Sequence, residues 1–311
     1  MGPFPLRRLA PRELSPALQA FGPVGDSVWV EGPVPIGPVV ALVGTRDATQ
    51  AGVGFTKELA RALGRRGILV ASGGARGIDA AAHEGSLDDG HPTLAVLPTG
   101  PPRLYPAAHA ALFARLRASG GTLVWPFEPR TAAHPSRFFL RNGVLVALSV
   151  AVVVVEAGAP SGSLNAAAWA RRLGRPLYAC AGPPWAEGLR GGTQLVAQGA
   201  RIVRSTASLV EELSVLCAAP SLPFAAPADA TLGDDAAGGT APWEDGIPLD
   251  DDERAVAAAC TAAPSYRDAL LLTTGLSGSQ LAAVILRLQL RGLLQELPSG
   301  QLAWAPGRRT A

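Results

Sequence analysis

The sequence predicts an α/β protein in which a doubly wound parallel sheet is followed by a small domain of three helices and a hairpin. Between residues 39 and 180, short runs of Val, Ile, Leu and Ala alternate with stretches of helical spacing. Continuous apolar runs are typical of strands that helices cover on both faces of a parallel sheet. After residue 252 the pattern changes to helical stretches and two short apolar runs. A chain of 311 residues suits one large domain and one small one.

The main domain, residues 38–216, alternates expected strands and helices. We expect strands at 39–43, 68–71, 93–97, 123–125, 151–156 and 176–180. We expect helices at 50–66, 78–85, 107–118, 136–148, 162–173 and 193–198. Residues 1–37 are expected to form an N-terminal arm with one weak helix at 11–20 and a short apolar stretch at 28–30.

The second domain, residues 253–305, is expected to be a winged helix-turn-helix. Its helices fall at 253–263, 266–273 and 279–291, and its hairpin joins 293–297 to 302–304. Ser277 and Gln280 have the spacing of a capping box for the third helix. Helical spacing places one set of residues of this helix in the core, namely Leu281, Val284, Ile285 and Leu288, and leaves Gln280, Arg287 and Arg291 outside.

The formal net charge of +2 hides an uneven distribution along the chain. Residues 38–216 hold eighteen basic and eleven acidic side chains, a net charge of +7. Residues 217–252 hold eight acidic and no basic side chains and have no periodicity, which predicts an acidic disordered linker. No leader segment and no uncharged apolar run of membrane-spanning length is evident, so we expect a cytoplasmic protein without a membrane partner.

Three cysteines and four histidines are scattered along the chain. Such spacing argues against a disulfide framework or a metal cluster, and we expect neither a metal ion nor a cofactor.

Glycine-rich turns follow four of the apolar runs. Loops that leave the carboxyl ends of parallel strands meet in one crevice, where helix N-termini present unpaired N–H groups that attract phosphate. Arg46, Arg76 and Arg141 lie in or near these turns, and no nucleophile accompanies them. We therefore expect an anion-holding surface whose ligand is a nucleic-acid backbone. Its turn residues are Gly44, Thr45, Arg46, Ser72, Gly73, Gly74, Arg76, Gly77, Ser161, Gly162 and Ser163.

Alternatives remain for the individual side chains. Arg46 could instead pair with Asp47 or Asp79, and an Arg76–Asp79 pair that shapes the loop is as plausible as direct phosphate contact. Phe138 lies beside Arg137, Arg141 and Asn142, an aromatic and basic pattern on which bases of a single strand stack; the alternative is an ordinary core phenylalanine.

Two further polar residues invite interpretation. Glu156 ends a strand in the crevice and must cap a helix, pair with an arginine or meet a sugar or base edge, because a carboxylate repels phosphate. His83 is interpreted as a structural histidine, since no nucleophile lies beside it.

Ordered motifs over residues 28–216 resemble those of the DNA-processing protein A (DprA/Smf) family. They are Val43-Gly44-Thr45-Arg46, Ser72-Gly73-Gly74-Ala75-Arg76-Gly77-Ile78-Asp79, Leu97-Pro98-Thr99-Gly100 with Tyr105-Pro106, Arg141-Asn142, Val155-Glu156-Ala157 and Ser161-Gly162-Ser163-Leu164. A weaker match covers 253–304. The resemblance implies an extended Rossmann-like domain that binds single-stranded DNA, forms a homodimer and, without catalysis, protects incoming DNA and loads the RecA recombinase in natural transformation.

The chain departs from the family pattern at several positions. Phe139 and Gly143 stand where the family usually has proline and arginine; Ala166, Ala181 and Thr193 replace threonine, proline and asparagine. The resemblance places Gly143 on the crevice helix, so an arginine restored there is expected to tighten DNA binding.

The sequence bears on three rival functions. A nucleotide-cleaving phosphoribohydrolase shares the fold class but needs a glutamate on the helix after its glycine turn, where this chain has Ala166-Ala167-Ala168. A dinucleotide oxidoreductase lacks support because Gly44-Thr45-Arg46 is not a G-x-G-x-x-G turn. A protein-interaction scaffold, in which the winged helix docks a partner rather than DNA, remains open.

Overall fold

The computed structural model describes residues 4–19, 26–158, 162–183, 186–218, 249–262, 265–291, 293–296 and 301–304. The chain divides into two compact units, Met1–Ala230 and Thr231–Ala311, which we describe separately. Among the described residues, no helix combines the length and apolar character that crossing a membrane requires.

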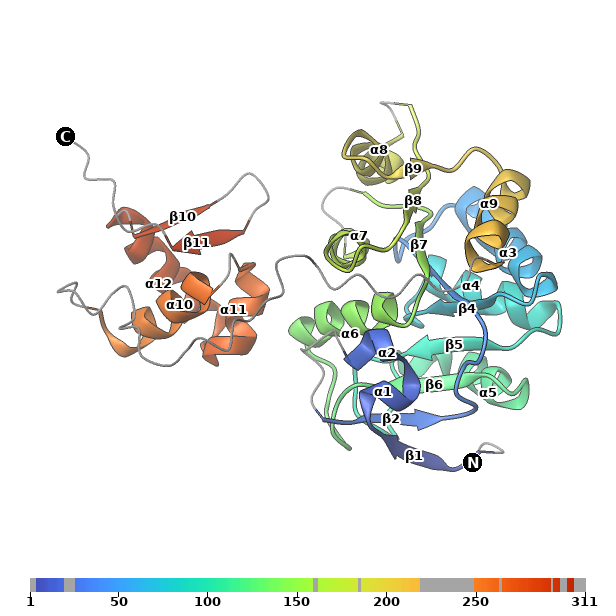
Figure 1. Cartoon of the computed structure of the whole chain (residues 1–311), viewed down its shortest axis with the longest axis horizontal. Coiled ribbons are helices and arrows are strands. Elements are labelled where there is room, and N and C mark those ends of the chain that lie inside the picture. Colours follow the sequence, from blue (N-terminus) through green and yellow to red (C-terminus); the bar gives the residue numbers. More distant parts are fainter. Residues whose placement is uncertain are drawn as a thin grey trace. The chain divides into compact units, whose positions relative to one another are not determined.

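The described part of the first unit is built on a nine-stranded sheet with the order β1-β2-β6-β5-β4-β3-β7-β8-β9 (Figure 1). Its strands are β1 (Leu6–Leu9), β2 (Val28–Glu31), β3 (Val39–Val43), β4 (Leu69–Ser72), β5 (Thr93–Val96), β6 (Thr122–Trp125), β7 (Ala151–Val154), β8 (Leu177–Ala179) and β9 (Arg201–Ile202). β3 pairs in parallel with β4 on one side and with β7 on the other. The strand order therefore reverses between β3 and β7, as the predicted doubly wound sheet requires.

Helices cover both faces of this sheet (Figure 1). On one face lie α3 (Gln50–Arg65), α4 (Ile78–Asp88), α5 (Ala110–Ala118) and α9 (Thr206–Ala218). On the other lie α1 (Pro11–Leu14), α2 (Pro16–Gln19), α6 (Pro135–Ala147), α7 (Ser163–Arg172) and α8 (Arg190–Ala197), and short 3-10 turns occur at η1 (Ala107–His109) and η2 (Glu187–Leu189).

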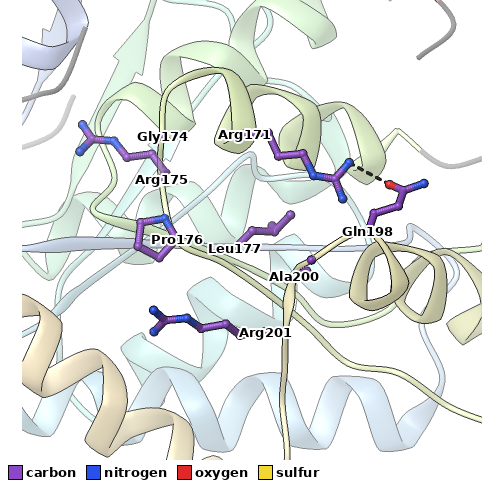
Figure 2. Close-up of a pocket in the computed structure, with 9 residues that line it drawn as sticks. Arg171, Gly174, Arg175, Pro176, Leu177, Gln198, Ala200 and Arg201 are labelled. Atoms are coloured by element: carbon purple, nitrogen blue, oxygen red, sulfur yellow. Dashed lines mark hydrogen bonds between the residues drawn. The ribbon is translucent and has the colours of Figure 1, made fainter. Parts of the chain in front are cut away.

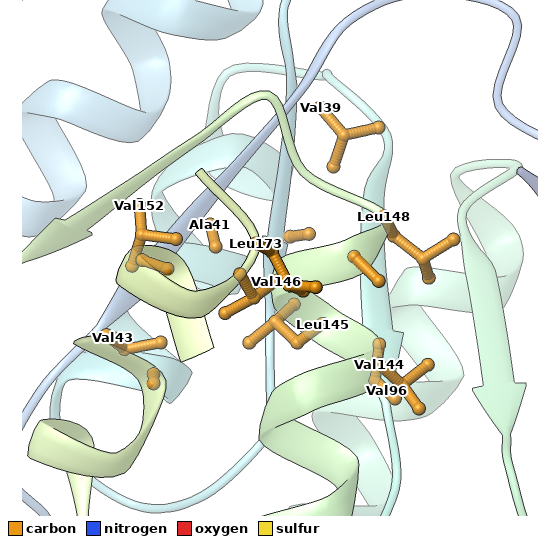
Figure 3. Packing of buried hydrophobic residues seen from close by; sticks show 14 of the residues in the cluster. Val39, Ala41, Val43, Val96, Val144, Leu145, Val146, Leu148, Val152 and Leu173 are labelled. Carbon is orange, nitrogen blue, oxygen red and sulfur yellow. The ribbon is translucent and has the colours of Figure 1, made fainter. Parts of the chain in front are cut away.

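Alternate residues of β3 point to opposite faces because successive side chains of a strand alternate. Val40 and Leu42 pack against α3 and α9, while Val39 and Val43 pack with the apolar side chains of α6, including Val144 (Figure 3). On both faces of the sheet the contact between helices and strands is made by buried apolar side chains. This packing fixes α6 over the centre of the sheet. This placement brings the first turns of α6 to the carboxyl ends of the strands.

The N-terminal segment differs from the expected arm. β2 pairs antiparallel with β6, and β1 pairs antiparallel with β2, so both extend the sheet. The helix expected at 11–20 is two short helices, because Ser15 is extended and precedes Pro16, a position that disfavours helical backbone. β9 and α9 were not expected either; β9 has only two residues, and both are exposed.

The second unit contains three helices and a hairpin within its described residues. They are α10 (Asp251–Ala262), α11 (Arg267–Thr274), α12 (Gly278–Leu290), β10 (Leu294–Glu296) and β11 (Leu302–Trp304), with β10 and β11 antiparallel. The predicted capping box of Ser277 and Gln280 is confirmed at the start of α12. The four predicted core residues of α12 are each at most 2% exposed.

The predicted linker, residues 217–252, lies outside the described residues except at its ends. There α9 continues through Ala218, and α10 begins at Asp251.

Candidate nucleic-acid interface

Loops from several strands meet at the carboxyl edge of the sheet. The backbone N–H of Thr45, after β3, donates to the carbonyl of Glu156, after β7, at 2.7 Å. The N–H of Ile78, after the β4 turn, donates to the carbonyl of Thr45 at 3.2 Å, and the Asn142 amide of α6 donates to the carbonyl of Gly162 at 3.3 Å. We call the surface formed by residues 44–49, 73–77, 137–142 and 162–163 the carboxyl-edge surface.

An exposed arginine and an aromatic ring lie together on this surface. The guanidinium carbon of Arg46 is 5.1 Å from the centre of the Phe138 ring, a cation–π distance. Tyr105 meets the same ring edge-on, with 5.4 Å between the ring centres. Among the ion pairs of the described residues, Asp47 contacts Arg76 at 3.4 Å rather than Arg46. Arg46 is therefore an exposed cation that lies over an aromatic ring.

Arg141, by contrast, is buried beneath the surface. It is 4% exposed, and its Nη1 lies 3.7 Å from Oδ2 of Asp79, which is itself 6% exposed. The same Nη1 donates to the carbonyl of Val96, and the N–H of Ala75 donates to Asp79. Burial raises the pKa of Asp79 and lowers that of Arg141. The Arg76–Asp79 alternative is wrong, since Arg141 is the partner of Asp79.

The turn after β4 depends on two glycines. A Cβ at Gly73 would collide with the Arg141 guanidinium, so only glycine lets the turn lie on this side chain. Gly77 has φ +75°, a left-handed conformation, and a Cβ there would strike the carbonyl of Thr45. The buried Asp79–Arg141 pair thus supports the glycine turn from below.

Glu156 caps a helix, one of the three roles considered for it. Its carboxylate is 5% exposed and accepts from the N–H of Thr49 at 2.9 Å and from the Thr49 hydroxyl at 2.7 Å. The Thr49 hydroxyl oxygen in turn accepts from the N–H of Gly52 in the first turn of α3. The negative charge is therefore withdrawn from the surface.

His83 is a structural histidine, as expected. It is fully buried, and burial lowers its pKa to about 3, so the ring is neutral. The Thr93 hydroxyl donates to the carbonyl of Val70, so it accepts from Nδ1 of His83 at 2.9 Å.

The remaining predicted site residues differ in burial and in the groups they contact. Ser72 is buried and donates to the carbonyl of Leu42, and Ser163 is 6% exposed. Arg137 donates to the carbonyl of Ala132 and lies 5.9 Å from the Phe127 ring, away from Phe138. Ser161 lies outside the described residues.

Two residues of the 97–109 loop join the surface without having been chosen from the sequence. Tyr105 contacts Phe138, and Nδ1 of His109 donates to the carbonyl of Gly74 at 2.9 Å. Tyr105 was visible only as part of a family motif, and the His109 contact carried no sequence signal because it depends on how the loop folds back.

The expectation for Gly143 stays a prediction. Gly143 lies on α6, as expected, and the residue itself is buried. Thr193, another departure, keeps a polar role because its hydroxyl accepts from the N–H of Gly182 at 3.2 Å.

In the second unit, the two arginines predicted to lie outside the core form ion pairs; Arg287 belongs to α12, and Arg291 caps its C-terminus. Arg287 Nε and Arg291 Nη1 lie 3.0 and 2.9 Å from the carboxylate oxygens of Glu253 in α10, and Arg287 also contacts Asp250 at 3.1 Å. Glu253 is 4% exposed. The charges of these two arginines are thereby paired with acidic side chains within the unit.

Sequence comparison connects both units with one family. The profile of "DNA recombination-mediator protein A" matches residues 16–214, and that of the "DprA winged helix domain" matches residues 240–300. A DNA processing protein DprA of Mycobacterium tuberculosis is 41% identical over 196 residues, which cover 61% of this chain and 50% of that protein. This chain spans about half the length of the curated relatives it matches.

Solved structures agree with these matches. DprA of Streptococcus pneumoniae superposes with a TM-score of 0.59 at 27% identity, covering 68% of this chain and 74% of that one. DprA of Helicobacter pylori, described for its single-stranded DNA binding mode, gives a TM-score of 0.58 at 25% identity, covering 68% and 98%.

Proposed function

This chain belongs to the DNA recombination-mediator protein A (DprA/Smf) family, and we propose that it binds single-stranded DNA on its carboxyl-edge surface. The observation that carries the proposal is the exposed Arg46 guanidinium over Phe138, beside the glycine turn at 73–77. An arginine grips a phosphate with two N–H groups, and an aromatic ring stacks a base without regard to its identity. Together they suit a flexible strand whose bases are unpaired.

A titration with labelled oligonucleotides tests this proposal. Wild-type protein is titrated into single- and double-stranded DNA of equal length at two salt concentrations. We expect tighter binding of the single strand and an affinity that falls with salt, because phosphate contacts release counterions. Equal affinity for both forms, or affinity independent of salt, would contradict it.

We further propose that the chain acts without catalysis. The first turn of α7 carries no acidic residue, and Ala166 and Ala167 are fully buried, so the helix that holds the glutamate in phosphoribohydrolases offers none here. Release of ribose 5-phosphate from nucleoside monophosphates, measured with purified protein, would overturn this proposal.

Family membership also supports a role in the cytoplasm as a homodimer that loads RecA during transformation. Ile202 of the end strand β9 is 45% exposed, which makes this edge of the sheet a candidate dimer contact. Light scattering tests the dimer. RecA filament formation on DNA coated with a single-strand binding protein tests loading, which should become faster when this protein is added.

A further inference from the structure

A pocket of about 360 Å³ opens at the amino-terminal edge of the sheet, opposite the carboxyl-edge surface. It lies where α7 and α8 end and where β8 and β9 begin (Figure 2). Its lining residues are Arg171, Gly174, Arg175, Pro176, Leu177, Gln198, Gly199, Ala200 and Arg201. Three of these nine residues are arginines and none is acidic, so the lining has a formal charge of +3.

The partners described for two of the guanidinium groups are neutral. Arg171 donates to the side-chain oxygen of Gln198 at 2.8 Å, and Arg201 donates to the Tyr178 hydroxyl at 3.1 Å. These contacts orient the two groups without cancelling their charge. Arg175 donates to the carbonyl of Ala147 at 3.3 Å. A guanidinium carries five N–H donors, so each can hold its neutral partner and still donate to a ligand.

The arginines could instead serve a structural role at the C-terminal ends of α7 and α8, since basic side chains stabilise helix C-termini. Each helix end carries about half a negative charge. Two ends therefore offset about one of the two positive charges of Arg171 and Arg201, and a surplus remains that an anion can neutralise. Arg175 and Arg201 moreover lie outside the two helices, next to β8 and β9.

We propose that this pocket binds a phosphate group. Guanidinium forks match the oxygen geometry of phosphate, and Leu177 with Pro176 gives the pocket an apolar wall beside the charges. The group could belong to a nucleotide or to the backbone of a DNA strand; the recognising chemistry is the same. The inference does not depend on the proposed DNA site, because the two share no residue.

Calorimetric titration of the full chain with pyrophosphate and with ADP tests the pocket. Wild-type protein should bind at least one of them, and Arg171→Gln/Arg201→Gln should weaken that binding by about tenfold or more through loss of two charge-assisted contacts. Arg172→Gln is the matched control: Arg172 follows Arg171 on α7, is exposed and lies over Trp169 outside the lining. Its affinity should stay within about twofold of wild type. If the wild-type protein binds neither ligand at concentrations up to about 10 mM, the dissociation constant lies above the millimolar range and the proposal is overturned. An equal loss in Arg172→Gln would overturn it as well.

Two further arms identify the source of the phosphate and protect the test against misfolding. Arg171→Gln alone retains the Arg201–Tyr178 contact and should still weaken binding, with an unchanged unfolding temperature. In an Arg46→Ala background, a thymidine oligonucleotide that displaces pyrophosphate identifies DNA as the source, and ADP binding without such displacement identifies a nucleotide. If wild-type protein binds pyrophosphate but no oligonucleotide, that result counts against the proposed DNA site alone.

Discussion

Arg46 is the residue on which the proposed DNA site most depends. Arg46→Ala should weaken single-strand binding and reduce the slope of log affinity against log salt by about 0.7, the value for one phosphate contact on a single strand. The fold should be unaffected, since the Arg46 side chain is exposed and lies over the Phe138 ring at the surface rather than in the core. Fluorescence anisotropy over a salt series measures both quantities.

Arg66→Ala serves as the control for this prediction. Arg66 is exposed at the far end of α3, so its removal lowers the net charge equally but leaves the carboxyl-edge surface intact. Equal effects of the two variants would mean that net charge, rather than a site at Arg46, drives binding.

Arg141→Met should destabilise the first unit by about 3–5 kcal/mol, because it leaves Asp79 buried without its counter-charge. The pKa of Asp79 is already raised by burial, and removal of Arg141 raises it further. The folded variant then binds the Asp79 proton more tightly than the unfolded chain does. Its stability therefore falls as the pH rises from the pKa of Asp79 in the unfolded chain to the higher pKa of Asp79 in the folded variant. Relative to wild type, the deficit should be small below about pH 4 and grow toward neutral pH.

Urea unfolding at several pH values measures this deficit. Arg141→Met/Asp79→Asn is the control variant, since it removes the titrating group and should abolish the pH-dependent part of the loss. A deficit that does not vary with pH would show that Arg141 acts by packing rather than by its charge.

At the scale of elements, α10 and α12 are coupled by charge. Because the arginines of α12 contact Glu253 and Asp250, Arg287→Ala should leave DNA affinity within about twofold of wild type. Glu253→Gln should lower the stability of the second unit by about 1–2 kcal/mol, since a nearly buried acceptor loses two charge-assisted bonds. Oligonucleotide titration and calorimetry measure the two effects. A large loss of affinity in Arg287→Ala would assign DNA contact to α12 and weaken the case for a protein-docking winged helix.

At the scale of the whole molecule, the two units have separate buried clusters. Leu63 belongs to a cluster of the first unit and Ile285 to that of the second, and the clusters share no residue. Leu63→Ala and Ile285→Ala should each destabilise its own unit by about 2–5 kcal/mol. Scanning calorimetry should show one transition moving in each variant while the other stays; a single transition shifted by both would mean that the units unfold together.

Apolar periodicity and glycine punctuation predicted most elements of the doubly wound sheet and the four core positions of α12. These signals are local, because a strand or helix face is written in the spacing of a few residues. The same locality explains why β1 and β9 were not predicted, since short edge strands of largely exposed residues show no alternation of apolar and polar side chains. The division of the helix at Ser15 was not predicted either.

The sequence also brought Arg46, the glycine turns and Phe138 to one edge, because parallel strands share a carboxyl end. Only the tertiary structure decided which arginine is exposed and which is buried, that Glu156 caps α3, that Gly143 is buried, and that Asp79 pairs with Arg141 rather than Arg76. It also brought three arginines, from α7, from the loop before β8 and from β9, to one pocket. Burial and charge pairing depend on contacts between residues distant in the chain, and a single sequence does not encode those contacts in its local pattern.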